Sequence, residues 1–182
     1  RGDVPSLASF LGDEGYATLA IHPFAGWFWN RANVYRSFGF AQFLSEETLP
    51  ALAKRGPLAS DAALTEEIIA RVDASEAPMF LFAVSLQGHG PYEPGRYPDS
   101  PIKVDAGVSD WARGSIGTYA EGIADADRGL ARLVQWAKGR KRPTVILFFG
   151  DHLPPLGPVY VETGFMPELV APGTVTVTTV IT

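Results

Sequence analysis

The sequence predicts a single α/β domain over residues 1–182, built on a mostly parallel sheet flanked by helices. Short apolar runs at 17–21, 79–86 and 144–149 are expected to form strands. Segments with helical spacing separate these runs, an alternation typical of parallel strands joined by helices. A histidine follows closely on each run: His22, His89 and His152. Because the carboxyl ends of parallel strands share one edge of a sheet, we expect the imidazoles to meet there.

The N-terminal segment is expected to form a helix ahead of the first strand. Asp3 can cap this helix, with Pro5 in its first turn. Gly12 or Gly15 then ends it, because glycine commonly terminates helices. The strand 17–21 follows directly.

The middle of the chain is expected to alternate in the same way. Residues 27–38 are predicted as a short helix and 40–44 as a short strand. Ser60 and Asp61 open a longer helix, whose apolar residues fall at helical spacing: Leu64, Ile68, Ile69 and Val72. Pro78 then precedes the strongly apolar strand 79–86.

A long loop and a long helix are expected after this strand. Residues 87–115 are rich in Gly, Pro, Asp and Ser, and connections of this length usually serve a function. Apolar residues at spacings of three and four predict a helix over 115–138. Its basic end complements the helix dipole, and we assign no ligand to it. The strand 144–149 follows, and another strand-like run lies at 175–182.

Composition excludes several classes of function. A hydrophobic content of 46% with 19% charged residues is ordinary for a globular domain. A net charge of -5 without a long basic run argues against a nucleic-acid surface. Since there is no cysteine, a metal could be held only by oxygen and imidazole ligands. No apolar stretch approaches the roughly 20 residues of a membrane span, so any membrane attachment is expected through a segment outside this chain.

Gly150-Asp151-His152 is a candidate metal site at the end of the last predicted strand. A carboxylate beside an imidazole suits a divalent ion such as Mn²⁺, Zn²⁺ or Mg²⁺. In an equally favoured alternative, Asp151 is a turn or cap residue and His152 is a surface side chain with its hydrogen bonds satisfied.

Two further segments are candidates for substrate binding. Glycines flank His89 and allow a ligand to approach the backbone closely, although loop histidines are often structural. After His22, Trp29 offers an aromatic wall and Arg31 a fork of donors suited to phosphate or sulfate. In the alternative reading, the aromatic residues belong to the core and Arg31 is a surface cation.

Taken together, these motifs resemble the lipoteichoic acid synthase and phosphoglycerol transferase family, which belongs to the sulfatase and alkaline phosphatase superfamily. The resemblance runs over about residues 4–165. It implies an alkaline-phosphatase or sulfatase-like fold. The motifs that carry it, in chain order, are His22-Pro-Phe24, Phe28-Trp-Asn-Arg31 with Tyr35, Ser37-Phe-Gly-Phe40, Gly88-His-Gly-Pro-Tyr92, Tyr119 with Ala126-Asp127, and Phe149-Gly-Asp-His-Leu-Pro154.

The resemblance assigns a role to each candidate residue. It implies that Asp151 and His152 are the metal pair, normally occupied by manganese, with zinc or magnesium as alternatives. It implies that the remaining residues hold the phosphoglycerol head group or steady the transferred phosphoryl: His22, Trp29, Arg31 and His89.

The implied activity is transfer of phosphoglycerol from an anionic phospholipid to a glycan or polymer acceptor, at the extracytoplasmic face of the bacterial cell membrane. Family enzymes use a metal-activated threonine, which comes from strands preceding the segment equivalent to 7–15. We therefore expect this chain to be incomplete at its N-terminus, to lack the nucleophile and to be inactive alone. A sulfatase, a phosphoethanolamine transferase and a non-catalytic domain that binds anionic head groups are the alternatives. The sequence leaves the donor, acceptor, metal and oligomeric state open.

Overall fold

The computed structural model of this chain describes residues 4–166, which fall into two compact units. The first, called the sheet unit, takes in residues 4–89 and 122–150. The second, called the loop unit, takes in 90–121 and 151–166. That these units form one domain stays a prediction.

The sheet unit is built on a parallel sheet of three strands in the order β2-β1-β5. The strands are β1 (Ala17–Ile21), β2 (Gln42–Leu44) and β5 (Met79–Ala83). Ile21 lies opposite both Leu44 and Ala83, so the three strands end level with one another. The predicted parallel α/β architecture is confirmed. The carboxyl edge of the sheet lies where β1 ends, and His22 is the next residue.

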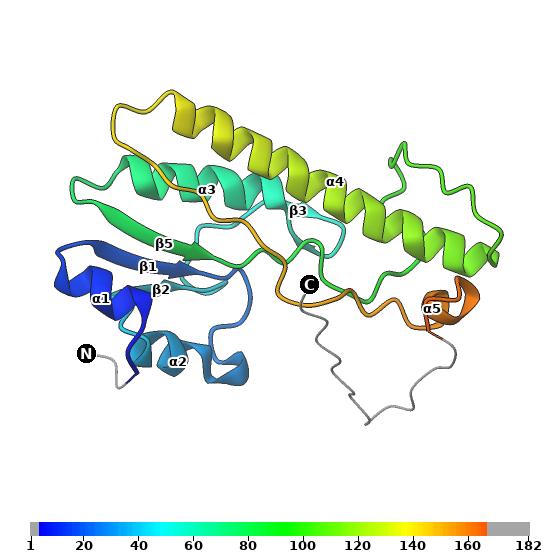
Figure 1. Ribbon diagram of the computed structural model, residues 1–182, viewed down its shortest axis with the longest axis horizontal. Coiled ribbons are helices and arrows are strands. Elements are labelled where there is room, and N and C mark those ends of the chain that lie inside the picture. The colour runs from blue at the N-terminus through cyan, green and yellow to red at the C-terminus, as the bar shows by residue number, and fades with distance from the viewer. Residues whose placement is uncertain (1–3, 167–182) are drawn as a thin grey trace. The chain divides into compact units, whose positions relative to one another are not determined.

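Helices cover both faces of this sheet (Figure 1). One side carries α1 (Leu7–Asp13) and α2 (Arg31–Ser37). The other carries α3 (Asp61–Asp73) and the later part of α4 (Asp110–Lys138), which enters the sheet unit at Gly122. A small antiparallel pair, β3 (Lys54–Arg55) and β4 (Leu58–Ala59), precedes α3.

Successive side chains of β5 point to opposite faces of the sheet, so the core has two layers. One layer is an aliphatic cluster that includes α3: Leu19, Ile21, Leu44 and Leu64, with Met79, Leu81 and Ala83 against it. Phe80 and Phe82 lie between these residues and pack with Phe40 on the other side of the sheet. Full burial of a large apolar side chain stabilises the fold by about 1.5–3 kcal/mol. A slip of one residue would turn these side chains toward the opposite face, so their burial fixes the strand register.

The first helix begins later than the sequence predicts. Its cap is Ser6, whose hydroxyl accepts the Ser9 N–H at 3.1 Å while the Ser6 N–H donates to the Ser9 hydroxyl at 2.9 Å. The prediction that Asp3 caps this helix was wrong: a reciprocal serine pair satisfies the first turn instead, and Asp3 lies outside the described residues.

The predicted helix over 27–38 is broken. A short 3₁₀ turn, η1 (Phe28–Asn30), precedes α2, and Trp29 and Asn30 adopt left-handed backbone angles with φ of 52° and 57°. The spacing of apolar residues does not predict a change to left-handed backbone angles. The helix predicted over 115–138 is confirmed but starts earlier, at Asp110, where the Ser109 hydroxyl accepts the Ala112 N–H at 3.2 Å.

Residues 144–149 were predicted as a strand, and this prediction was wrong. Within the described residues this run pairs with no strand, and Val145 and Leu147 are 94% and 82% exposed. A strand forms only when a neighbour accepts its ladder of hydrogen bonds, whatever its intrinsic preference. The strand-like run at 175–182 lies outside the described residues.

The loop unit packs around the first half of α4. Tyr92, Ala112, Leu156 and Val159 form its core, with α5 (Pro158–Glu162) beside the helix. The Glu162 carboxylate accepts the N–H and hydroxyl of Ser109 at 2.7 and 2.9 Å. Over residues 4–166, no helix combines the length and the apolar character needed to cross a membrane.

Candidate functional site

His22 lies at the carboxyl edge of the sheet, where β1 ends. Its side chain is almost fully buried at 3% exposure, and its Nδ1 lies 3.0 Å from the carbonyl oxygen of Val84. A carbonyl can only accept, so Nδ1 carries the hydrogen and Nε2 keeps its lone pair. This contact ties His22 to the chain leaving β5, which continues to His89.

Arg31 occupies a cradle of aromatic rings in the segment that follows His22. Its guanidinium carbon lies 5.6 Å from the Phe24 ring, 5.2 Å from Phe28 and 5.6 Å from Trp29. One terminal nitrogen of Arg31 is buried and has no hydrogen-bond partner among the described residues. The left-handed turn at Trp29 and Asn30 reverses the chain just before α2, and this reversal lets the aromatic rings surround the Arg31 guanidinium. The arrangement leaves one charged donor of Arg31 without a hydrogen bond in this part of the chain.

Neighbouring groups hold this cradle and set its charge. Burial raises the pKa of Tyr35, and the nearby Arg31 only partly opposes this effect, so Tyr35 stays neutral. Glu47 accepts the Gly26 N–H with both carboxylate oxygens, at 3.1 and 3.0 Å. A hydrogen bond from Ser45 and these backbone contacts lower the pKa of Glu47, which therefore remains ionised. Gly26 is required because a Cβ there would lie 2.9 Å from the Ser45 hydroxyl oxygen.

The loop that carries His89 is clamped by Gln87, which is only 1% exposed. The Gln87 side-chain oxygen accepts the Asp61 N–H at 2.8 Å, and its amide donates to Asp125 on α4. Arg55 and Arg128 pair with the same Asp125 carboxylate at 2.7 and 2.5 Å. Sequence reasoning missed this clamp. Its signal was a lone amide between an apolar strand and Gly88-His89-Gly90.

Asp61 is a buried acid behind this loop. Burial raises its pKa from 3.8 to about 6, and the charge of Asp125 adds to the effect. The Ser85 hydroxyl and the backbone of Gln87 oppose the shift without cancelling it. The first turn of α3 therefore changes its charge near pH 6.

Asp151 and His152 belong to the loop unit, and they lie close to each other. Asp151 Oδ2 is 3.6 Å from His152 Nε2, while His152 Nδ1 lies 2.8 Å from the Leu153 carbonyl oxygen. Donation from Nδ1 leaves Nε2 with a lone pair on the side of the carboxylate, as a metal ligand requires. The two side chains are largely exposed and fit a divalent ion as part of a ligand set.

No group of three or more potential ligands gathers within residues 4–166. That Asp151 and His152 converge with the residues expected to hold the head group stays a prediction. Those residues are His22, Trp29, Arg31 and His89.

Tyr92 borders the Asp151 pair within the loop unit. Burial raises the pKa of Tyr92 most, and Tyr119 and the charge of Asp151 contribute in the same direction. Tyr160 donates to the Pro154 carbonyl, which steadies the segment between His152 and α5. The prolines at 154 and 155 limit the conformations of the same segment.

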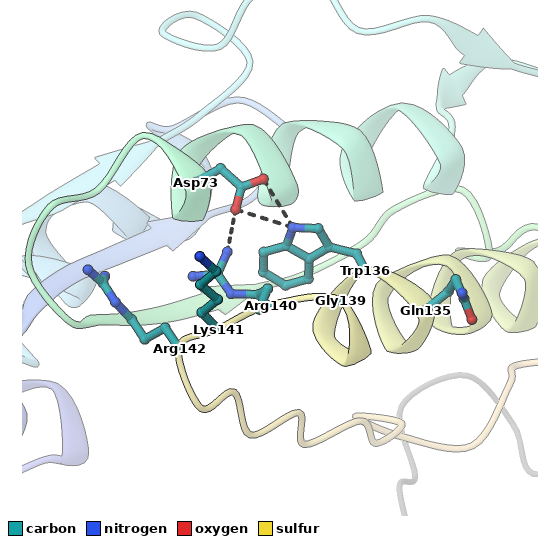
Figure 2. A pocket seen from close by; sticks show the side chains of 7 residues that line it. All are labelled: Asp73, Gln135, Trp136, Gly139, Arg140, Lys141 and Arg142. Carbon is teal, nitrogen blue, oxygen red and sulfur yellow. Dashed lines mark hydrogen bonds and ion pairs between the residues drawn. The ribbon is translucent and has the colours of Figure 1, made fainter.

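A surface depression lies at the carboxyl ends of α3 and α4 (Figure 2). Three of its lining residues are basic, Arg140, Lys141 and Arg142, and the others are Asp73, Gln135, Trp136 and Gly139. Asp73 accepts the Trp136 indole N–H at 3.0 Å and pairs with Arg140, whose guanidinium lies 4.4 Å from the Trp136 ring centroid. Arg142 donates to the carbonyls of residues 76 and 77 at 2.9 Å. These cations therefore join two helix ends. The depression lies at the opposite end of α3 from Asp61.

Comparison with known proteins relates this geometry to a family. The sulfatase family model matches residues 1–172. A relative from Rhizobium meliloti (strain 1021), named as a cyclic beta-1,2-glucan modification protein, is 54% identical over 171 residues. That match covers 94% of this chain and 27% of the relative, so the chain spans about a quarter of the relative's length.

Solved structures share the fold at lower identity. The phosphoglycerol transferase GacH of Streptococcus pyogenes, in complex with sn-glycerol-1-phosphate, has a TM-score of 0.69 and 24% identity. The match covers 82% of this chain and 40% of GacH. The lipoteichoic acid synthase LtaP of Listeria monocytogenes has a TM-score of 0.61 and 23% identity, with 74% and 33% covered.

Proposed function

Because this chain belongs to the sulfatase family, within the alkaline phosphatase superfamily, we propose that it is part of a metal-dependent phosphoglycerol transferase. The enzyme moves a glycerol phosphate head group from an anionic phospholipid to a glycan acceptor. Its threonine nucleophile lies outside residues 1–182, and the reaction takes place at the extracytoplasmic face of the membrane.

This proposal is carried by the buried nitrogen of Arg31 that has no hydrogen-bond partner within residues 4–166. A guanidinium whose donor is held among rings gains more from an anion than from water, because water is excluded around it. The planar fork also fixes the orientation of a phosphate. Trp29, 78% exposed beside it, provides an apolar wall for the glycerol carbons.

His22 and His89 act on the same group in this proposal. Since His22 Nδ1 faces the Val84 carbonyl, Nε2 is the ring nitrogen that the proposal assigns to a phosphoryl or glycerol oxygen. The Gln87 clamp fixes the start of the His89 loop, so that imidazole is presented without a large ordering cost.

Asp151 and His152 hold the metal in this proposal. A bound divalent ion, with Mn²⁺ first and Zn²⁺ or Mg²⁺ as alternatives, would supply a lowered nucleophile pKa and charge neutralisation. The donor set of one carboxylate and one imidazole supports such an ion, and the remaining ligands come from outside these residues.

The acceptor is proposed from the 54% identical relative, whose name refers to modification of a cyclic glucan. A sulfatase or a phosphoethanolamine transferase remains the alternative within the family, because an Asp-His metal pair serves each of these. Arg31 with Trp29 favours phosphoglycerol, since the ethanolamine ammonium would lie against a cation.

Mass spectrometry of the acceptor tests the proposal. The full-length protein is incubated with phosphatidylglycerol, cyclic β-1,2-glucan and Mn²⁺, and a phosphoglycerol adduct on the glucan is expected. The adduct should disappear with Asp151→Asn. Modification only from phosphatidylethanolamine, or cleavage only of an aryl sulfate, would establish the alternatives instead. Binding of glycerol phosphate without any product would support the non-catalytic reading.

A further inference from the structure

The loop of residues 24–31 presents a second exposed indole that the head-group site does not use. Trp27 is 76% exposed, and the Arg31 guanidinium stacks with Trp29, Phe28 and Phe24 rather than with Trp27. Phe28 stacks on Trp29 at 5.2 Å with 23° between the rings, whereas Trp27 meets Phe28 edge-on at 6.0 Å and 74°. The two indoles of this loop therefore present faces in different directions.

Trp27 is held by its backbone rather than displayed on a loose loop. Its carbonyl accepts the Asn30 N–H at 3.1 Å, and the preceding Gly26 is bound by both oxygens of Glu47. The Gly26 carbonyl also accepts the Ala32 N–H at 3.3 Å from the start of α2. A fixed backbone reduces the conformational entropy that this segment loses when a ligand binds to it.

The chemistry beside Trp27 favours a neutral ligand. The ionised Glu47 binds the backbone of the adjacent Gly26, and Glu46 is also exposed. The two acidic side chains add no attraction to an anionic membrane surface, to which an anchoring tryptophan normally brings lysine or arginine. A sugar ring carries no charge, and its polarised C–H groups are attracted to the electron-rich face of an indole.

We propose that the exposed indole of Trp27 is a stacking platform for a glucose ring of the glucan acceptor, next to the phosphoglycerol site at Arg31. The inference rests on the proposed function and adds the acceptor subsite to it. The donor group is held by Arg31 and Trp29, and the acceptor is held by Trp27. One loop thereby brings the two substrates together.

Steady-state kinetics of the full-length protein test this subsite with cyclic β-1,2-glucan and a soluble short-chain phosphatidylglycerol. Trp27→Ala should raise the KM for the glucan about tenfold, a typical effect of losing one aromatic stacking contact. Trp27→Phe should restore most of the affinity. Release of glycerol phosphate to water, measured without glucan, should not change. Trp111→Ala, which removes another exposed indole, is the matched control and should leave both reactions unchanged.

An unchanged KM for the glucan in Trp27→Ala would overturn the inference. It would also be overturned if this variant instead lost sedimentation with phosphatidylglycerol vesicles, since Trp27 would then contact the membrane. If the wild-type protein releases no glycerol phosphate, the proposed function fails by itself. Glucan titration followed by tryptophan fluorescence then still tests the platform: binding that is lost in Trp27→Ala supports it, and no binding in the wild type contradicts it.

Discussion

Arg31 has an unusual balance of interactions for a half-buried cation. A buried nitrogen without a hydrogen bond costs about 1–3 kcal/mol, while each ring beneath a guanidinium returns about 0.5–2 kcal/mol. Three rings lie against this guanidinium, so together they offset the cost of the missing hydrogen bond. The nitrogen keeps a hydrogen that an anion can accept, and for this reason the cradle favours phosphate over a neutral ligand.

The left-handed turn before Arg31 leads to a first prediction, on stability. Asn30 has a φ of 57°, a conformation that asparagine tolerates, glycine favours and β-branched residues resist. Asn30→Val should therefore lower the free energy of unfolding by about 1–2 kcal/mol, while Asn30→Gly should change it little. Urea denaturation of both variants measures the difference, and equal losses in the two would contradict the backbone assignment.

Asp61 gives a second prediction, on the pH dependence of stability. Its pKa is raised from 3.8 to about 6 in the folded state, so between these values the folded chain keeps a proton that the unfolded chain has released. Stability from this group is present at low pH and falls as the pH rises toward 6, by up to about 3 kcal/mol. Asp61→Asn should abolish this dependence in urea titrations at several pH values. Parallel curves for wild type and variant would disprove the shift.

At the scale of elements, the His89 loop depends on contacts from α3 and α4. Gln87→Leu keeps the volume but leaves the Asp61 N–H and the Asp125 carboxylate without this partner. We expect a loss of about 2–4 kcal/mol in stability and weaker binding of glycerol phosphate. The exposed Gln135 on α4 is the matched control, because Gln135→Leu removes an amide that faces solvent. Equal effects in the two variants would argue against a clamp.

The sequence predicts elements well where burial imposes a period. Apolar spacing identified strand 17–21 and the helix from Asp61, with Ser60 as its start. It also predicted a strand over 79–86, which the structure forms over Met79–Ala83. Strands β3 and β4 are too short for their apolar residues to show an alternating pattern. The break was missed because tryptophan has no preference for the left-handed backbone angles that Trp29 adopts.

The same limits apply to the candidate site. Histidines that follow strands could be placed at the sheet edge from topology alone, and His22 lies there. The orphaned nitrogen of Arg31 and the amide clamp of Gln87 depend on side-chain packing between distant segments, which one sequence does not encode locally.

At the scale of the whole molecule, residues 145–149 leave an apolar run facing solvent. Val145, Leu147, Phe148 and Phe149 are all exposed, with strong β preference and no charge. We expect the isolated chain to self-associate through this run. Leu147→Lys should increase the monomer fraction in analytical ultracentrifugation, and an unchanged distribution would show that this run does not drive association.

Titration calorimetry of glycerol phosphate with the full-length protein tests the central claim, that Arg31 binds the phosphoglycerol group. Arg36→Gln is the matched control, because Arg36 lies on the same helix, is exposed and contacts Asn33 at 3.0 Å. With both variants folded by circular dichroism, Arg31→Gln should raise Kd about tenfold or more, as expected for a lost charge-assisted contact, while Arg36→Gln should match the wild type. The same Kd for all three proteins would contradict the assignment.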